Sequence, residues 1–182
     1  MVGNSSYISD AEKQEYYIKC WNKRCKEANI SEEDPGHSFM NNLITEINDV
    51  GKRKTRYKLN YNREQLIVIL FAFLSSVFSG LMSFVNNEDG RKMLGVLGIF
   101  IGASIAAINS YTIWKSTKET WLRCSSYRAK LVLETDAFCD DTGEYEKLGN
   151  AGDKINLFKD KINILRKEDY SKFFINMGFD FS

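Results

Sequence analysis

Hydrophobic residues gather in the middle third of this chain, whereas both ends mix polar and apolar positions. From Leu66 the sequence reads LIVILFAFLSSVFSGLMSFV, and no ionisable side chain follows until Glu88. From Met93 it reads MLGVLGIFIGASIAAINSYTIW, again without a charged side chain. A helix of about 20 apolar residues crosses roughly 30 Å of hydrocarbon. Buried helices of soluble proteins are usually shorter and carry a polar stripe, so we predict membrane-spanning helices near residues 66–85 and 93–114.

A short polar segment, residues 86–92 (NNEDGRK), separates the two apolar runs and contains a glycine that favours a turn. So short a connection makes the two helices antiparallel neighbours and puts both chain ends on one side of the bilayer. The flanking basic residues are Lys52, Arg53, Lys54, Arg56, Lys58 and Arg63 before the first run, and Lys115, Lys118, Arg123, Arg128 and Lys130 after the second. The excess of basic residues in the flanks predicts that both termini are cytoplasmic. Binding of nucleic acid or specific lipids is the weaker explanation of this cluster.

Each predicted membrane helix carries small residues at spacings of three and four. In lipid, helices associate through close backbone packing and hydrogen bonds, and small residues permit both. The predicted helix-packing residues are Ala72 on the first helix and Gly95, Gly98, Gly102 and Ala106 on the second. The simpler interpretation is that these residues only hold the hairpin or an oligomer together.

A second interpretation is that polar residues of the hairpin line a water path. Hydroxyl and amide groups can line such a path without the cost of a buried charge. The candidate pore-lining residues are Ser76, Ser79, Ser83 and Asn109. Two helices cannot enclose a pore, so this interpretation requires a homo-oligomer.

Apolar residues at helical spacing predict further helices in both flanks. One covers residues 9–28, where Ser9 and Glu12 fit a capping box. Another begins near Ser38 and continues through the basic segment into the membrane. The second membrane helix is expected to run on to Cys139, a rod of about 70 Å.

Past that rod, the acidic and glycine-containing segment 140–143 ends the helix. An amphipathic helix is expected near residues 150–167, followed by an aromatic tail that packs on the helices before it. The predicted fold is therefore all-α, a two-helix transmembrane hairpin with long cytoplasmic helical extensions. The segments are 1–64, 65–114 and 115–182, of which the first and last are the cytoplasmic helices.

Composition gives no sign of an enzyme or of a cofactor. The net formal charge of the 182 residues is +1, which offers no electrostatic basis for a nucleic-acid partner. His37 is the only histidine, and the four cysteines lack zinc-site spacing, so no metal site and no catalytic residue are predicted. In the reducing cytosol these cysteines are expected to be free thiols. Phosphate-loop and nucleophile-elbow patterns are absent from the sequence.

The order of these features resembles the SLATT family, two-membrane-helix effectors associated with SMODS and SLOG proteins in bacteria. The likeness covers roughly residues 57–174. It includes the basic entry with Arg63, the two close membrane helices and the following stretch WLRCSSYRAKLVLETDAF. An acidic, glycine- and tyrosine-containing turn (140–145) and an amphipathic helix (154–165) come next. The most specific residues are Tyr127, Arg128 and Ala129, with the pair Gly143 and Tyr145.

The resemblance implies an effector of a bacterial anti-phage or conflict system in the inner (cell) membrane. Such an effector would oligomerise and form a pore or disrupt the membrane, and a separate protein that makes or senses a nucleotide signal would activate it. Two alternatives stay open. One is a membrane scaffold whose hairpin only anchors cytoplasmic helices that recruit partners. The other, a constitutive transporter or channel, is disfavoured because no charged residue lies within the spans.

Overall fold

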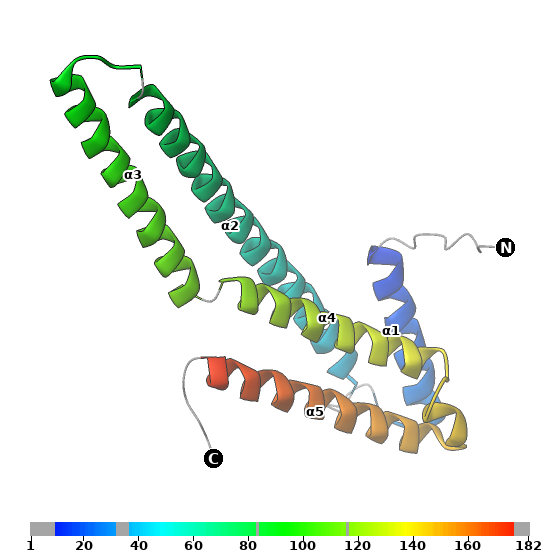
Figure 1. The fold of residues 1–182 in the computed structure, drawn as a ribbon. Coiled ribbons are helices and arrows are strands. Elements are labelled where there is room, and N and C mark those ends of the chain that lie inside the picture. The colour runs from blue at the N-terminus through cyan, green and yellow to red at the C-terminus, as the bar shows by residue number, and fades with distance from the viewer. Residues whose placement is uncertain (1–9, 32–36, 83, 116, 177–182) are drawn as a thin grey trace. The chain divides into compact units, whose positions relative to one another are not determined.

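The computed structural model describes residues 10–31, 37–82, 84–115 and 117–176, and every regular element among them is a helix. The prediction of an all-α fold is confirmed. In chain order the helices are α1 (Asp10–Glu27), α2 (Phe39–Met82), α3 (Glu88–Lys115), α4 (Thr117–Cys139), the short 3₁₀ helix η1 (Tyr145–Lys147) and α5 (Ala151–Asn176). Figure 1 shows their order along the chain.

The chain divides into two compact units. The flank unit combines residues 1–52 with residues 123–182, and the hairpin unit comprises residues 53–122. The two flanks, which the sequence presented as separate segments, therefore fold together as one body. Helix α2 contributes its first part to the flank unit and its second part to the hairpin unit.

The flank unit has a well-packed core to which α1, the start of α2, α4 and α5 all contribute. The rings of Phe138 and Phe158 stack with their centroids 4.3 Å apart, and Trp21 lies 5.9 Å from Phe138 and 6.1 Å from Phe158. The indole N–H of Trp21 donates to the carbonyl of His37. The buried apolar residues of this core are Tyr17, Trp21, Cys25, Met40, Leu43, Ile44, Ile47, Val50, Cys124, Tyr127, Leu131, Phe138, Tyr145, Ile155, Phe158 and Ile162.

The helix periodicity in the flanks predicted most of this core correctly. Residues three and four positions apart lie on one helix face, so a repeated apolar residue marks the buried side. The N-terminal helix and the helix entering the apolar segment occur where they were expected, as α1 and α2. Ser9 lies outside the described residues, so its capping box stays a prediction.

Helix α4 ends where the acidic segment predicted. Asp141 and Gly143 both adopt left-handed backbone angles, with φ of 58° and 67°, which α-helices cannot continue. The amide of Thr142 bonds back to the carbonyl of Ala137, which satisfies one of the last carbonyls of the helix.

Three predicted boundaries are wrong. The expected unbroken helix from residue 93 to Cys139 is two helices, because α3 ends at Lys115 and α4 begins at Thr117. The sequence Ser-Thr-Lys-Glu at this junction has the hydroxyl-to-carboxylate spacing that starts helices. Gly90 does not break a helix but lies in the first turn of α3, since Asn87 caps that helix through a bond from the amide of Asp89 to its side chain.

The third boundary is the end of α5, which extends to Asn176 and includes most of the expected aromatic tail. Tyr170 is exposed on this helix, so it does not pack as expected. Phe173 is 39% exposed, and the guanidinium of Arg123 lies 4.8 Å from its ring centroid. Phe174 and the residues after Asn176 carry no described side chains.

Candidate functional site in the apolar hairpin

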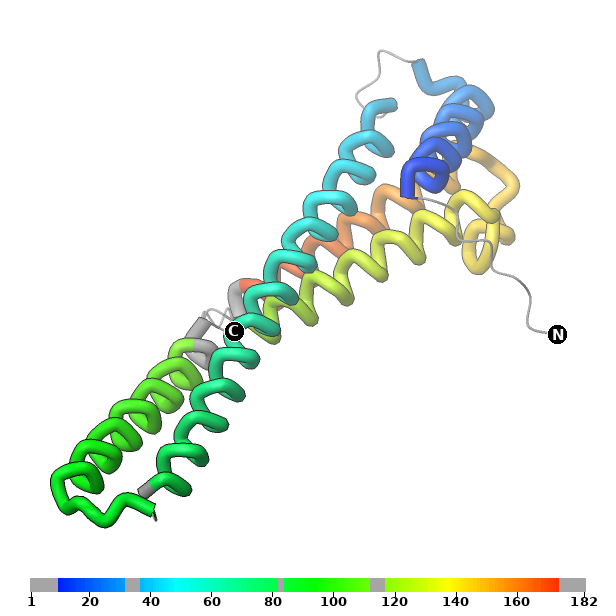
Figure 2. Tube along the Cα trace, turned by 90° about the horizontal axis from the view of Figure 1, so that it is seen from above, coloured from blue at the N-terminus to red at the C-terminus, as the bar shows by residue number. Residues whose placement is uncertain are grey.

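The hairpin unit contains two helices that are long and apolar enough to cross a membrane. They lie side by side and antiparallel in both views (Figure 1 and Figure 2). No residue of the most apolar 18-residue window of either helix is buried within the protein. Exposed large side chains include Ile69 and Phe73 on α2 and Ile99 and Phe100 on α3, each with 66 to 73% of its surface exposed. So large a continuous apolar surface is unfavourable in water, whereas it is favourable among acyl chains.

One stripe on each helix is partly covered and marks where the two helices face each other. On α2 the stripe includes Phe71, Ser75 and Phe78, and on α3 it includes Ile101 and Ile105. The spacing of three and four residues is that of one helix face. The partly covered positions thus include bulky residues and also small ones, such as Ser75 and Gly98.

Two of the predicted helix-packing residues, Gly98 and Gly102, have open space at the position of a Cβ atom. Ala72, Gly102 and Ala106 are exposed, whereas Gly95 and Gly98 are partly covered. A Cβ atom built on Gly98 or Gly102 would meet no atom within 4 Å. Within this chain, no neighbouring atom comes so close to Gly98 or Gly102 that glycine would be required there. A role in contacts between copies stays a prediction.

The structure describes three of the four candidate pore-lining residues. Ser76, Ser79 and Asn109 are exposed, and Ser83 lies outside the described residues. The hydroxyl of Ser76 donates to the carbonyl of Ala72 at 3.0 Å, a bond that satisfies it within its own helix. Ser76, Ser79 and Asn109 are therefore on the exposed surface of the hairpin.

Aromatic side chains lie at the end of the hairpin unit nearest the chain flanks. The rings of Tyr61, on α2, and Trp121, on α4, stack at a centroid distance of 6.2 Å. Tyr111 is half exposed near the end of α3. Tyrosine and tryptophan prefer the membrane–water interface because their rings are apolar and carry one polar group. The side chain of Trp114, near the end of α3, is not among those described.

The flank unit contains a network of buried and half-buried polar contacts that sequence reasoning missed. Arg24 donates to the carbonyl of Phe138 and lies 3.3 Å from the carboxylate of Asp141, which also accepts two bonds from Lys154. The hydrogen bond from Lys154 holds the pKa of Asp141 below its usual range, and Arg24 adds to this effect. These residues tie α1 and α5 to the segment that ends α4.

Buried tyrosines extend the network. The hydroxyl of Tyr17 donates to Asp136, and the hydroxyl of Tyr145 donates to Glu134, both at 2.5 Å. Burial, and then the bond to a carboxylate, raises the pKa of each tyrosine far above its ordinary value, so both hydroxyls stay protonated donors. Partners such as Tyr17 and Asp136 are 119 positions apart, so no local spacing in the sequence could have indicated them.

Comparisons with protein-family models, with curated proteins and with solved structures find no match to this chain. Among the described residues, no group of three or more His, Cys, Asp or Glu side chains is placed to hold a metal ion. A functional interpretation therefore starts from the exposed apolar hairpin and from the flank unit that accompanies it.

Proposed function

We propose that this chain is a membrane effector of a bacterial anti-phage or conflict system, which oligomerises through its hairpin and forms a pore or disrupts the inner membrane. The observation that carries the proposal is the hairpin surface, which is apolar and unburied along both helices. The resemblance to SLATT effectors, stated above, supplies the biological role. Both termini are cytoplasmic in this proposal, because basic side chains flank the hairpin on that side.

The outward position of the small residues supports assembly from several copies. Gly102 and Ala106 on α3 face away from the partly covered stripe, as do Ala72 and Ser76 on α2. Small residues on an outer helix face permit another helix to approach closely in lipid. Asn109 is exposed on the same helix as Gly102, and an amide at membrane depth is more stable with a polar neighbour or water than among acyl chains. An oligomer would supply both a closely packed helix for the small residues and a polar environment for Asn109.

The flank unit supplies the switch in this proposal. Its core and polar network give it a defined structure of its own. A ligand shifts a conformational equilibrium only by binding one state more tightly than the other. A separate protein that makes or senses a nucleotide signal, or the signal itself, would bind this unit and favour the open assembly.

Dye release from liposomes tests perforation directly. The purified full-length protein is reconstituted into liposomes of phosphatidylethanolamine and phosphatidylglycerol that contain a self-quenched dye. With the activating partner protein or signal supplied, we expect release with the wild-type protein and reduced release with Gly102→Leu, since a bulky side chain separates neighbouring copies. Val96→Leu is the matched control, because Val96 is an exposed residue of the same helix and the change adds only a methylene. Circular dichroism checks that both variants keep their helices.

Growth and membrane potential in cells separate the effector from a scaffold. Expressed in bacteria together with its cognate trigger, the wild-type protein should depolarise the membrane and stop growth together. Replacing residues 65–114 with an unrelated pair of membrane helices should abolish both effects. Growth arrest without depolarisation, or arrest that survives the replacement, would assign the chain to the scaffold class instead.

A further inference from the structure

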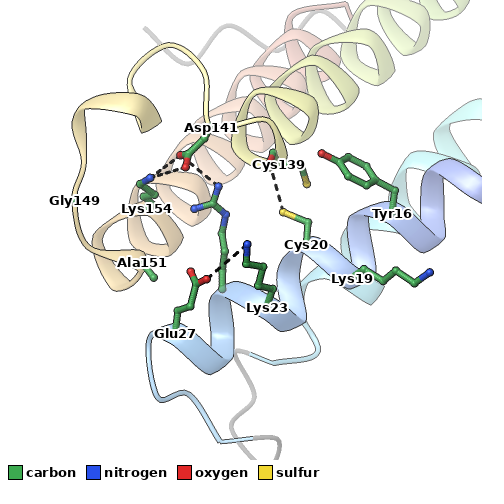
Figure 3. A pocket seen from close by; sticks show the side chains of 11 residues that line it. Tyr16, Lys19, Cys20, Lys23, Glu27, Cys139, Asp141, Gly149, Ala151 and Lys154 are labelled. Atoms are coloured by element: carbon green, nitrogen blue, oxygen red, sulfur yellow. Dashed lines mark hydrogen bonds and ion pairs between the residues drawn. The ribbon is translucent and has the colours of Figure 1, made fainter.

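Two cysteines far apart in the sequence lie next to each other in the flank unit. Cys20 belongs to α1, and Cys139 is the last residue of α4. Their positions in the sequence differ by 119. The Sγ atom of Cys20 lies 3.9 Å from the carbonyl oxygen of Cys139. Figure 3 shows the side chains of Cys20 and Cys139 close together, with the Cys20 thiol donating to the carbonyl oxygen of Cys139.

Solvent and small solutes can reach this thiol pair. Cys20 and Cys139 line a pocket of about 450 Å³, and each is partly exposed. The other two cysteines, Cys25 and Cys124, are buried in the core. Exposure therefore distinguishes the pair from the remaining thiols of the chain.

The surroundings of the pair favour a thiolate on one sulfur and a thiol on the other. The hydrogen bond with Cys139 and the positive charge of Arg24 lower the pKa of Cys20 to about 7, against the opposing effect of burial. The same hydrogen bond and burial raise the pKa of Cys139. A thiolate, not a thiol, is the nucleophile in cysteine oxidation. Near neutral pH, Cys20 is thus the attacking group and Cys139 keeps its proton.

We propose that Cys20 and Cys139 form a redox modification site that a hydroperoxide converts to an intramolecular disulfide. In the first step the Cys20 thiolate attacks one peroxide oxygen, the O–O bond breaks, and sulfenic acid and hydroxide (or alkoxide) form. In the second step the Cys139 sulfur attacks the Cys20 sulfur, and its proton leaves with the hydroxyl as water. The two thiols lose two electrons in total, and the peroxide accepts them.

The disulfide links the middle of α1 to the end of α4. Tyr16 already bonds to Asp140 at 2.7 Å, and Arg24 already bonds to the carbonyl of Phe138, so the same two segments are held together in the reduced state. Disulfides in a reducing cytosol are usually transient and redox-sensing, and not structural. The site does not depend on the proposed membrane function, since both cysteines belong to the flank unit.

Mass spectrometry of the full-length protein in detergent micelles tests the site. The reduced protein is exposed to hydrogen peroxide, the remaining thiols are alkylated, and the peptides are mapped. We expect a cross-linked peptide pair containing Cys20 and Cys139, two fewer alkylated cysteines and a mass lower by about 2 Da from the lost hydrogens. Cys139→Ser should stop at the sulfenic acid of Cys20, which dimedone traps, and Cys20→Ser should give neither product.

Two further measurements keep the test decisive if a variant at the pair folds poorly. Cys124→Ser removes a buried thiol and should form the disulfide as the wild-type protein does. Alkylation of the unmodified wild-type protein as a function of pH should show Cys20 reacting half-maximally near pH 7 and Cys139 reacting far more slowly. A wild-type protein in which Cys20 and Cys139 stay reduced while other thiols oxidise, or which forms only intermolecular disulfides, would overturn the proposal.

Discussion

Arg166 of α5 holds Glu46 of α2 through two nitrogen atoms, Nε at 3.0 Å and Nη2 at 2.7 Å, both from the carboxylate oxygen Oε2. The other oxygen, Oε1, accepts a hydrogen bond of 2.5 Å from the hydroxyl of Tyr127 on α4. Both side chains of the ion pair are less than a third exposed. One carboxylate therefore connects three helices of the flank unit.

Replacing Glu46 with glutamine should destabilise the flank unit by about 1–3 kcal/mol, because a half-buried guanidinium loses its charged partner. Chemical denaturation of the protein in detergent micelles, followed by circular dichroism, measures the change. A double-mutant cycle with Arg166→Gln should show that the two substitutions are not additive. The control is Glu15→Gln, since Glu15 and Lys19 form an exposed ion pair that contributes under about 1 kcal/mol.

Truncating the central aromatic stack should lower the free energy of unfolding more than Glu46→Gln does. Phe138 and Phe158 are fully buried with centroids 4.3 Å apart, so Phe138→Ala removes a large apolar surface and leaves a cavity. We expect a loss of about 3–5 kcal/mol in the free energy of unfolding of the flank unit. Leu133→Ala on the same helix is the control, because Leu133 is 70% exposed. Equal losses for the two variants would contradict the assignment of the core.

Acid should weaken the contact between Asp141 and Lys154. Since the pKa of Asp141 is lowered in the folded protein, its stabilising contribution is fully present above the unfolded pKa of about 3.9. The contribution is lost as the pH falls through the lower folded value. Asp141→Asn should therefore reduce stability at pH 7 and flatten part of the decline below about pH 4. Asp160→Asn, at an exposed position of α5, is the control for removing a carboxylate elsewhere in the same unit.

The orientation in the membrane can be read from single cysteines introduced into a chain without its own four. A membrane-impermeant maleimide applied to intact spheroplasts should label Asn86→Cys, in the connection between α2 and α3. It should not label Lys147→Cys, in the flank unit, until the membrane is opened. Both positions are exposed in the structure, so burial within the protein does not prevent the maleimide from reacting. The opposite pattern would place both termini outside.

The apolar periodicity of the chain predicted those features that depend on a single helix. Leu43, Ile47, Phe158 and Ile162 repeat at helical spacing, and the structure buries all four. The two long apolar runs likewise indicated helices able to cross a membrane, and α2 and α3 contain them. Prediction was poorer at boundaries such as Lys115 and Thr117, where the sequences on both sides favour a helix.

The hairpin shows the limit of pattern reasoning most clearly. The spacing of Gly98 and Gly102 correctly describes one helix face, but it cannot say which molecule that face meets. In the structure Gly98 is partly covered and Gly102 is exposed, and a Cβ atom on either would meet no atom within 4 Å. The prediction that the small residues serve contacts between copies still needs the liposome experiment.

Sequence alone determined the helical class of this protein, the faces that are apolar and the two segments that suit a bilayer, because each follows from residues within a few turns of one another. Tertiary structure decided that the two flanks form one unit and that Arg166 meets Glu46, with a separation of 120 positions. It also decided that the thiols of Cys20 and Cys139 become neighbours. Such pairs depend on how whole helices pack, and the periodicity within one helix does not indicate which distant residues it will contact.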